Sequence, residues 1–270
     1  MHFSVLMSLY YKEKVEYLTQ CFQSLLAQTV PATEIVLVFD GPIPQPLQDC
    51  VNEWQTRLPL KIVPLPENVG LGKALNAGLA ACSYEWVFRM DTDDLCVTDR
   101  FAKQVAYIEA HSEVSMVGGQ IEEFDTDNPA VKSIRRVPIE DSEIKKMAPV
   151  RCPFNHMALA YKKSAIQAVG GYQHHLFLED YNLWLRFLSA GYIAHNLPDI
   201  LIKMRAGQGM YNRRRGVQYF KSEWKLAKLK IKLGIQNPIN ALGIFIVRAT
   251  TRILPGKLLG QVYKLLRKLG

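Results

Sequence analysis

The N-terminal third of the chain alternates short apolar runs with segments of helical periodicity, and this alternation restricts the fold more than any other feature. Apolar runs of strand length cover 3–9, 34–39, 60–65 and 86–90. Between them, apolar residues recur at helical spacing over 15–28, 46–56 and 71–81. This order predicts βαβ units, and therefore an α/β fold with a mostly parallel sheet covered by helices on both faces.

The rest of the chain is less regular. We expect helices over 98–111 and 163–169, strands over 114–121 and 157–161, and an exposed acidic loop over 122–128. An amphipathic helix opens near Glu179, and its inward face consists of Leu183, Trp184, Phe187 and Leu188. The length of 270 residues suits one domain with an appendage better than two equal domains.

Acidic residues follow two of the predicted strands at the point where each strand ends. Asp40 follows the second strand, and Asp91, Asp93 and Asp94 follow the fourth. Ligands of open α/β sheets bind at the carboxyl ends of the strands. We therefore expect these carboxylates to converge in one cleft, together with Lys73 at the start of a helix.

The residue types in this cleft suit a metal and a diphosphate. Hard divalent cations such as Mg²⁺ and Mn²⁺ take carboxylate oxygens and accept substrate phosphates in their remaining positions. The N-terminus of the helix that carries Lys73 would add backbone N–H groups for phosphate. The alternative is an acidic loop in which Asp94 caps the following helix.

Asp180 stands in the first turn of the helix that opens near Glu179. A carboxylate at this place is favoured by the helix dipole, so capping explains it without any chemistry. The residue types alone leave capping and a catalytic role open.

Basic residues are concentrated towards the C-terminus. Residues 202–270 hold 16 Lys and Arg against one acid, whereas residues 1–201 hold 17 against 24 acids. Within 257–269, apolar side chains fall on one helical face and basic side chains on the other. This pattern predicts a helix at an anionic membrane surface. The alternative is a helix packed on the body with an ordinary solvated face.

The cysteines and the apolar runs indicate the compartment. The five cysteines are widely spaced and include no C-x-x-C pair, which argues against a disulfide framework and a zinc site. The N-terminal segment lacks the basic region and apolar core of a signal peptide, and no apolar run reaches the roughly 18 residues of a membrane span. We therefore expect a cytoplasmic protein, peripheral on the inner face of the cell membrane.

Five segments, taken in order, resemble the motifs of family 2 of the nucleotide-sugar glycosyltransferases. They are 3–8, Val38-Phe39-Asp40-Gly41, 68–76, Met90-Asp91-Thr92-Asp93-Asp94 and 179–186. The resemblance implies a GT-A fold, a nucleotide-diphosphate sugar donor, Mn²⁺ or Mg²⁺, and inversion at the anomeric carbon. The chain looks most like the bacterial β-1,3-galactosyltransferases of O-antigen or capsule synthesis, which extend N-acetylglucosamine on diphospho-undecaprenol.

The resemblance covers residues 1–205, and the charge pattern sets the remaining residues apart. Residues 1–205 would form the GT-A catalytic domain, with the nucleotide-sugar half in 1–97 and the acceptor half in 98–205. Residues 206–270 would form a basic, amphipathic helical tail that associates with the membrane. The implied partners are a UDP-sugar donor, a lipid-linked sugar acceptor and an anionic membrane surface, without nucleic acid.

Roles follow from the resemblance position by position. Asp93 would bind the metal, Asp91 the ribose or the water shell of the metal, and Asp180, beside Glu179, would be the catalytic base. The implied nucleotide-sugar site consists of Leu9, Tyr10, Glu13, Asp40, Lys73, Asp91 and Arg205. The acceptor side consists of Asn155, His156 and Trp184. A structural histidine is the alternative for His156.

Two positions depart from the family pattern. Phe39 replaces the first acid of the usual D-D-G motif, and 203–208 offers no histidine as an extra metal ligand. Arg205 lies in that second region, where it would contact the diphosphate instead.

Other functions fit the sequence less well. The Gly70-x-Gly72 pair lacks the third glycine of a dinucleotide site, and the P-loop Ser or Thr is missing after Lys73. A sugar-1-phosphate nucleotidyltransferase would carry a glycine-rich basic loop where 10–13 stands here. A nucleic-acid-binding protein would use 213–215 on phosphates, which leaves the acidic motifs unexplained.

Overall fold

The computed structural model describes residues 1–125, 132–206 and 216–253. Its strands are β1 (Phe3–Leu9), β2 (Glu34–Phe39), β3 (Leu60–Pro64), β4 (Trp86–Arg89), β5 (Leu95–Cys96), β6 (Val114–Asp125), β7 (Lys132–Arg135), β8 (Ala160–Lys162) and β9 (Ile193–Ala206). Its helices are α1 (Val15–Leu26), α2 (Gln45–Trp54), α3 (Leu71–Ala81), α4 (Arg100–Ala110), α5 (Asp141–Met147), the 3₁₀ turn η1 (His156–Ala158), α6 (Lys163–Ala168), α7 (Glu179–Ser189), α9 (Val217–Lys232) and α10 (Pro238–Ile253). The predicted strand and helix alternation up to β4 is confirmed.

The strands form one sheet in the order β3-β2-β1-β4-β8-β6-β9-β5, with β7 paired to β6. β3, β2, β1 and β4 are parallel, β8 is antiparallel to both β4 and β6, and β6 and β9 are parallel to each other. Leu9 pairs with Phe39, and Leu6 with Arg89, so β1, β2 and β4 end at the same edge of the sheet. The motifs that follow these strands therefore share that edge.

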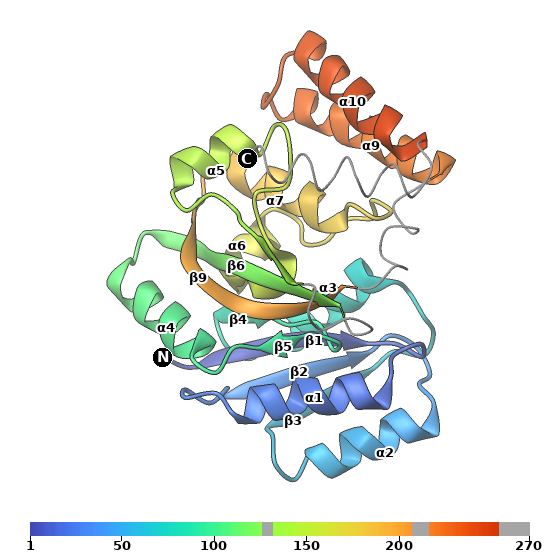
Figure 1. Cartoon of the computed structure of the whole chain (residues 1–270), viewed down its shortest axis with the longest axis vertical. Coiled ribbons are helices and arrows are strands. Elements are labelled where there is room, and N and C mark those ends of the chain that lie inside the picture. The colour runs from blue at the N-terminus through green and yellow to red at the C-terminus, as the bar shows by residue number, and fades with distance from the viewer. Residues whose placement is uncertain (126–131, 207–215, 254–270) are drawn as a thin grey trace.

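Helices cover both faces of this sheet (Figure 1). Successive strand side chains point to opposite faces, so Val5 and Met7 face one layer and Leu6 faces the other. Val5 and Met7 pack in a core cluster with side chains of α1, α2 and α4. Leu6 packs in a second cluster with side chains of α3, α6 and α7. Because the strands are covered on both faces, they are continuously apolar, as expected for parallel strands.

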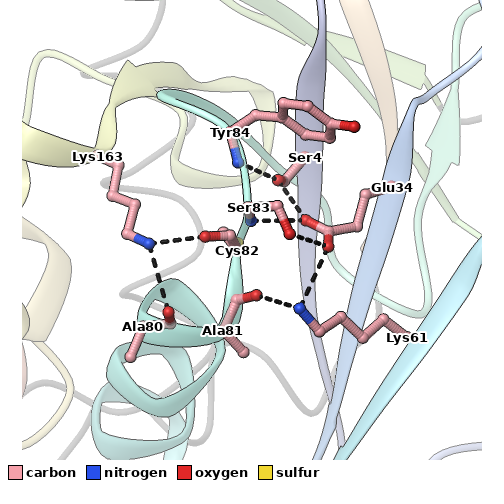
Figure 2. A network of polar contacts seen from close by, with 9 residues as sticks. All are labelled: Ser4, Glu34, Lys61, Ala80, Ala81, Cys82, Ser83, Tyr84 and Lys163. Carbon is pink, nitrogen blue, oxygen red and sulfur yellow. Dashed lines mark hydrogen bonds and ion pairs between the residues drawn. The ribbon is translucent and has the colours of Figure 1, made fainter.

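A polar network closes the amino-terminal edge of the sheet and fixes the end of α3 (Figure 2). Glu34 accepts hydrogen bonds from Ser4 Oγ (2.6 Å) and from the N–H and Oγ of Ser83 (2.9 and 2.7 Å). Lys61 and Lys163 donate to carbonyls of the last turn of α3 and the residue after it, at 2.6 Å each. Cations favour a helix C-terminus. The network holds α3 so that its N-terminus lies at the carboxyl edge, where the acidic motifs are.

The strand predicted over 114–121 is longer in the structure, and the acidic loop predicted over 122–128 is wrong for 122–125. β6 continues to Asp125 because it is paired on both sides, by β7 and by β9. Glu123 is buried and accepts a hydrogen bond from Ser133 Oγ (3.1 Å), and Lys132 lies 3.5 Å from Glu122. Strand pairing outweighs the acidic composition here. Residues 126–128 lie outside the described part of the chain.

The strand predicted over 157–161 is divided. Its first part is the η1 turn, closed by a hydrogen bond from Ala158 N to Asn155 O (2.9 Å), and β8 begins only at Ala160. Apolar content alone does not distinguish a buried turn from a buried strand.

The C-terminal part consists of two helices, α9 and α10, which pack side by side at one end of the molecule (Figure 1). α9 carries Lys221, Lys225, Lys228, Lys230 and Lys232. The arginines 213–215 and the amphipathic segment 257–269 lie outside the described residues. Among the described helices, none is both long and apolar enough to cross a membrane.

Candidate functional site

A cavity of about 430 Å³ opens at the carboxyl edge of the sheet. Four of the predicted site residues line it: Asp91, His156, Glu179 and Asp180. Its other lining residues come from α3, the segment before α7, and α9; they are Leu71, Gly72, Leu75, Tyr172, Leu176, Phe177 and Tyr219. Residues far apart in sequence are thus brought to one chamber.

Two helix N-termini meet at this cavity. Gly72 lies in the first turn of α3, and a Cβ on it would stand 3.4 Å from Glu179 Cγ in the first turn of α7. The absence of a side chain therefore allows the two helices to approach closely. Both N-termini contribute a positive potential, which favours an anion such as a diphosphate.

Asp91 is held by an arginine that the sequence analysis did not single out. Arg89 is fully buried at the end of β4, forms an ion pair with Asp91 Oδ1, and donates to the carbonyl oxygens of Met90 and Leu6. Its own carbonyl accepts a hydrogen bond from Arg100 Nη2 (2.8 Å). A charged residue within an otherwise apolar strand was the signal available in the sequence.

The other acids of the motif are also fixed. Asp94 is buried and accepts a hydrogen bond from Arg205 N (2.8 Å), and Thr92 Oγ1 donates to Glu13 (2.7 Å). Burial, together with the charges of Asp91 and Glu13, raises the pKa of Asp93 to about 7. Burial and the neighbouring carboxylates also raise the pKa of Asp94. The motif therefore concentrates negative charge that the protein neutralises only in part.

This carboxylate cluster fits a divalent cation shared with a substrate. No cluster of three or more His, Cys, Asp or Glu side chains suited to a metal occurs in the described ranges. Mg²⁺-type ions, however, commonly use one or two carboxylates and complete their shell with water and substrate phosphates. Asp91 and Asp93 supply that number, and a bound cation would offset the repulsion that raises the pKa of Asp93.

Arg205 lies beside the motif. Its Nε donates to Asp93 O (2.9 Å) and its Nη2 to Gln20 Oε1 (2.7 Å), while its guanidinium lies 4.0 Å from the ring centroid of Tyr17. The arginine is therefore positioned by three elements: the motif, α1 and β9.

The remaining residues predicted for the nucleotide sugar have mixed placements. Asp40 is buried, and its carboxylate accepts from Val69 N (2.7 Å) and Asn68 Nδ2 (3.1 Å), so it organises the loop before α3. Leu9 is fully buried; Tyr10 is partly exposed in the turn after β1, and Lys73 is exposed on α3.

Asp180 is the second residue of α7, and its Oδ1 accepts a hydrogen bond from Tyr181 N (2.7 Å). The carboxylate thus satisfies a backbone group of the first turn and also lines the cavity. Burial, followed by the charge of Asp180, raises the pKa of the adjacent Glu179. Capping and a chemical role are compatible at this position.

The predicted acceptor residues differ in their access to the cavity. His156 Nε2 lies 2.8 Å from Tyr172 Oη, and burial and the charge of Arg89 lower its pKa to about 4, so its imidazole is neutral at pH 7. Asn155 and Trp184 are fully buried. Asn155 Nδ2 donates to Gly119 O (2.9 Å), and Trp184 packs in the core. These two residues support the cavity from behind rather than line it.

Tyr219 also escaped the sequence analysis, and it contacts Phe177 in the segment before α7. Phe177 has a left-handed backbone conformation (φ 68°), and its ring stacks on that of Tyr219 with centroids 5.3 Å apart. A non-glycine residue with this φ is strained, and such strain is often found at functional sites. No periodicity in the sequence marks this pair, because α9 contributes one ring and the segment before α7 the other.

Comparison with known proteins agrees with this geometry. The family model described as "Glycosyl transferase family 2" matches residues 4–170. The amylovoran biosynthesis glycosyltransferase AmsE of Erwinia amylovora is 48% identical over 98% of this chain and 99% of its own length. The UDP-Gal:alpha-D-GlcNAc-diphosphoundecaprenol beta-1,3-galactosyltransferase of Escherichia coli is 35% identical over 97% of this chain and 95% of its own.

Among solved structures, S. aureus TarS 1–349 in complex with UDP-GlcNAc superposes with a TM-score of 0.69. The alignment covers 93% of this chain and 72% of that chain at 20% identity, which supports the GT-A fold alone. These matches do not favour a nucleotidyltransferase or a nucleic-acid-binding protein. The family match and the near full-length relatives agree, and the chain belongs to glycosyltransferase family 2.

Proposed function

We propose that this glycosyltransferase transfers galactose from UDP-galactose, in a β-1,3 linkage and with inversion, to N-acetylglucosamine on diphospho-undecaprenol. The observation that carries the chemistry is one cavity lined both by Asp180 and by Asp91 of the acidic motif. The name of the 35% identical relative supports the choice of donor, linkage and acceptor. The reaction would serve the synthesis of a polysaccharide or O-antigen repeat unit.

Asp180 is the proposed general base. A sugar hydroxyl is a weak nucleophile, so a carboxylate within hydrogen-bond reach must take its proton as the new glycosidic bond forms. A base on the side opposite the leaving diphosphate produces in-line attack and inversion. Glu179, the neighbouring acid with a raised pKa, keeps a second carboxyl group at the cavity and assists in binding the acceptor.

The donor side of the proposal uses the acidic motif. Asp93 and Asp91 are the residues that would hold Mn²⁺ or Mg²⁺. When bound, the ion acts as a Lewis acid that offsets charge on the departing nucleoside diphosphate. Arg89 fixes the carboxylate of Asp91, and Arg205 stands beside Asp93 to contact the diphosphate. Leu9, Tyr10, Glu13, Asp40 and Lys73 are assigned to the nucleotide-sugar side, with Asp40 acting through the loop that it holds.

The acceptor side of the proposal places His156 in the cavity as a neutral hydrogen-bonding group oriented by Tyr172. Asn155 and Trp184 act indirectly, by holding the walls of that cavity. We place the reaction on the cytoplasmic side, with the protein peripheral on the inner face of the membrane, because the acceptor would be lipid-linked. In this proposal, residues 1–205 carry the reaction and 206–270 the membrane contact.

The test is sugar transfer from a panel of nucleotide sugars to an N-acetylglucosamine-diphospho-lipid, with Mn²⁺ or with EDTA. We expect transfer from UDP-galactose that EDTA abolishes. Asp180→Asn keeps an oxygen for the Tyr181 N–H but removes the base, so the turnover number should fall by at least about 10²-fold. Asp93→Asn should lower turnover similarly and weaken the response to Mn²⁺.

Asp49→Asn, at an exposed position on α2, is the matched control and should retain wild-type transfer. Near-normal turnover in Asp180→Asn would rule out this base. Transfer from a different nucleotide sugar would replace galactose and leave the site assignment intact.

A further inference from the structure

The hairpin of α9 and α10 has an outer face of large apolar side chains. Trp224 is 41% exposed, Leu242 47% and Ile239 83%. Phe220 and Trp224 of α9 pack against Phe245 of α10, with ring centroids 5.1 and 5.0 Å apart. We call these five residues the docking face. Single exposed apolar residues are ordinary, but a contiguous patch on two adjacent helices marks a contact surface.

The opposite face of the hairpin is fixed to the body. Arg248 of α10 pairs with the buried Glu223 of α9 (2.7 and 2.8 Å) and also donates to Val150 O (3.1 Å). Lys230 donates to Pro149 O (2.7 Å). Because these contacts hold the inner face against the body, the docking face points outward.

Exposed lysines lie on α9, the helix that carries Phe220 and Trp224 of the docking face. Lys221, Lys225, Lys228 and Lys232 lie on α9, and the ammonium of Lys228 stands 5.3 Å from the ring centroid of Trp224. Glu223 is the one acid in 217–253 and is buried against Arg248. The exposed formal charge of the described hairpin is therefore positive. Aromatic rings flanked by lysines are typical of helices in the interface of an anionic bilayer.

Charge also distinguishes the possible occupants of this face. A second copy of the chain would bring the same lysines together, and like charges repel. The chain's own residues 254–270 contain basic residues and no acids, so they also lack complementary charge. Anionic lipid head groups supply the missing negative charge. We propose that the docking face binds an anionic lipid bilayer through the rings and aliphatic side chains, with the lysines on the head groups.

The docking face adjoins the catalytic cavity. Tyr219, the neighbour of Phe220 in the first turns of α9, lines the cavity and stacks on Phe177. A hairpin seated on the bilayer would therefore place the cavity close to a lipid-linked sugar. The proposed function assigns the membrane contact to 206–270, and the docking face is the surface within that range that would make it. The use of this contact, to bring acceptor and cavity together, rests on the proposed function.

The test is flotation of the full-length protein with phosphatidylcholine vesicles, with and without phosphatidylglycerol. We expect flotation with the phosphatidylglycerol vesicles and its loss in high salt. The double variant Trp224→Ser/Leu242→Ser should bind at least about tenfold more weakly, because it removes two apolar side chains that the bilayer would bury. Leu26→Ser, which alters a 42% exposed leucine on α1, is the matched control and should float as the wild type does.

The charge contribution has its own pair of variants. Lys221→Glu/Lys232→Glu should weaken binding at least about tenfold, since each basic residue near an anionic surface is worth about a fivefold change in affinity. Lys146→Glu, an exposed change on α5, should leave binding unchanged. All variants should keep the circular dichroism spectrum of the wild type and its transfer to a soluble acceptor analogue.

Three results would overturn the assignment. Wild-type flotation of Trp224→Ser/Leu242→Ser is the first. The second is conversion of a dimer to a monomer in that variant, measured by sedimentation, with unchanged flotation, since a second copy would then cover the face. The third is loss of flotation in Leu259→Ser/Val262→Ser alone, which would move lipid binding to 254–270. Absence of transfer with intact flotation would contradict the proposed function and leave the bilayer contact standing.

Discussion

At the scale of single residues, Arg89 has the strongest influence on the site. It is fully buried, whereas its partner Asp91 keeps 28% of its side chain exposed. The ion pair therefore joins the protein interior to the cavity, and it determines which way one carboxylate of the motif points. Removing one member of a largely buried pair leaves the other with an incompletely compensated charge.

We predict that Arg89→Met lowers the free energy of unfolding by about 2–4 kcal/mol, because the Asp91 carboxylate and two carbonyl oxygens lose their donor. Urea unfolding of Arg89→Met, Asp91→Asn and the double variant measures the coupling of the pair. We expect a coupling energy above about 1 kcal/mol. Strict additivity of the two substitutions would show that Arg89 stabilises the strand independently of Asp91.

At the scale of elements, the orientation of α3 depends on the polar network at the amino-terminal edge of the sheet. Glu34 is its centre, and Lys61 and Lys163 hold the end of the helix. Partial burial acts to raise the pKa of Glu34, but the hydrogen bonds from Ser4 and Ser83 outweigh it, so the pKa is lowered from its ordinary value of 4.5. The carboxylate form is therefore the one that the folded state favours.

The linkage between this pKa and stability gives a pH-dependent prediction. Because the folded-state pKa lies below the unfolded value, the contribution of Glu34 is complete above pH 4.5 and is lost as pH falls through the folded-state pKa. Glu34→Gln should destabilise the protein by about 1–3 kcal/mol at pH 7 and by less in acid. Urea unfolding of the wild type and of Glu34→Gln, at pH 7 and at a pH below 4.5, measures this difference in the free energy of unfolding. Glu53→Gln, an exposed acid on α2, should show no such difference.

At the scale of the whole molecule, the C-terminal hairpin is joined to the catalytic body by buried polar contacts. Lys230 is the most informative, because its ammonium lies 5.0 Å from the ring centroid of Tyr181 on α7 and donates to Pro149 O. Burial, and then the charge of Arg248, lower its pKa to about 7. A hairpin held in this way moves with the cavity wall that it helps to form.

The buried position of Lys230 makes the free energy of unfolding depend on pH. Below about pH 7 Lys230 is charged in both folded and unfolded states, so its desolvation penalty is complete. As pH rises from about 7 towards 10.5, the unfolded state keeps the proton that the folded state releases, and stability increases. Lys230→Met should remove this increase in unfolding experiments. Lys228→Met, an exposed change on the same helix, should retain it.

The sequence by itself determined the elements and the chemical types at their ends. Continuous apolar runs with helical segments between them specify β1 to β4 and α1 to α3, because local periodicity reports how many faces of each element are buried. The placement of Asp40 and Asp91 could be inferred from the predicted strand ends, and that of Asp180 from the predicted start of α7. These inferences are local, so each could be made before any contact was known.

Only the tertiary structure decided which residues meet and how each is buried. Asp91, Asp180 and Tyr219 line one cavity because α7 packs in the same core cluster as β4, and α9 packs against α7. Arg89 and Trp184 point into the core rather than into solvent or the cavity. The physical reason is that burial depends on contacts between distant segments, and local residue patterns do not specify such contacts. The sequence likewise does not show which face of α9 and α10 packs against the body, so their exposed face could be identified only from the structure.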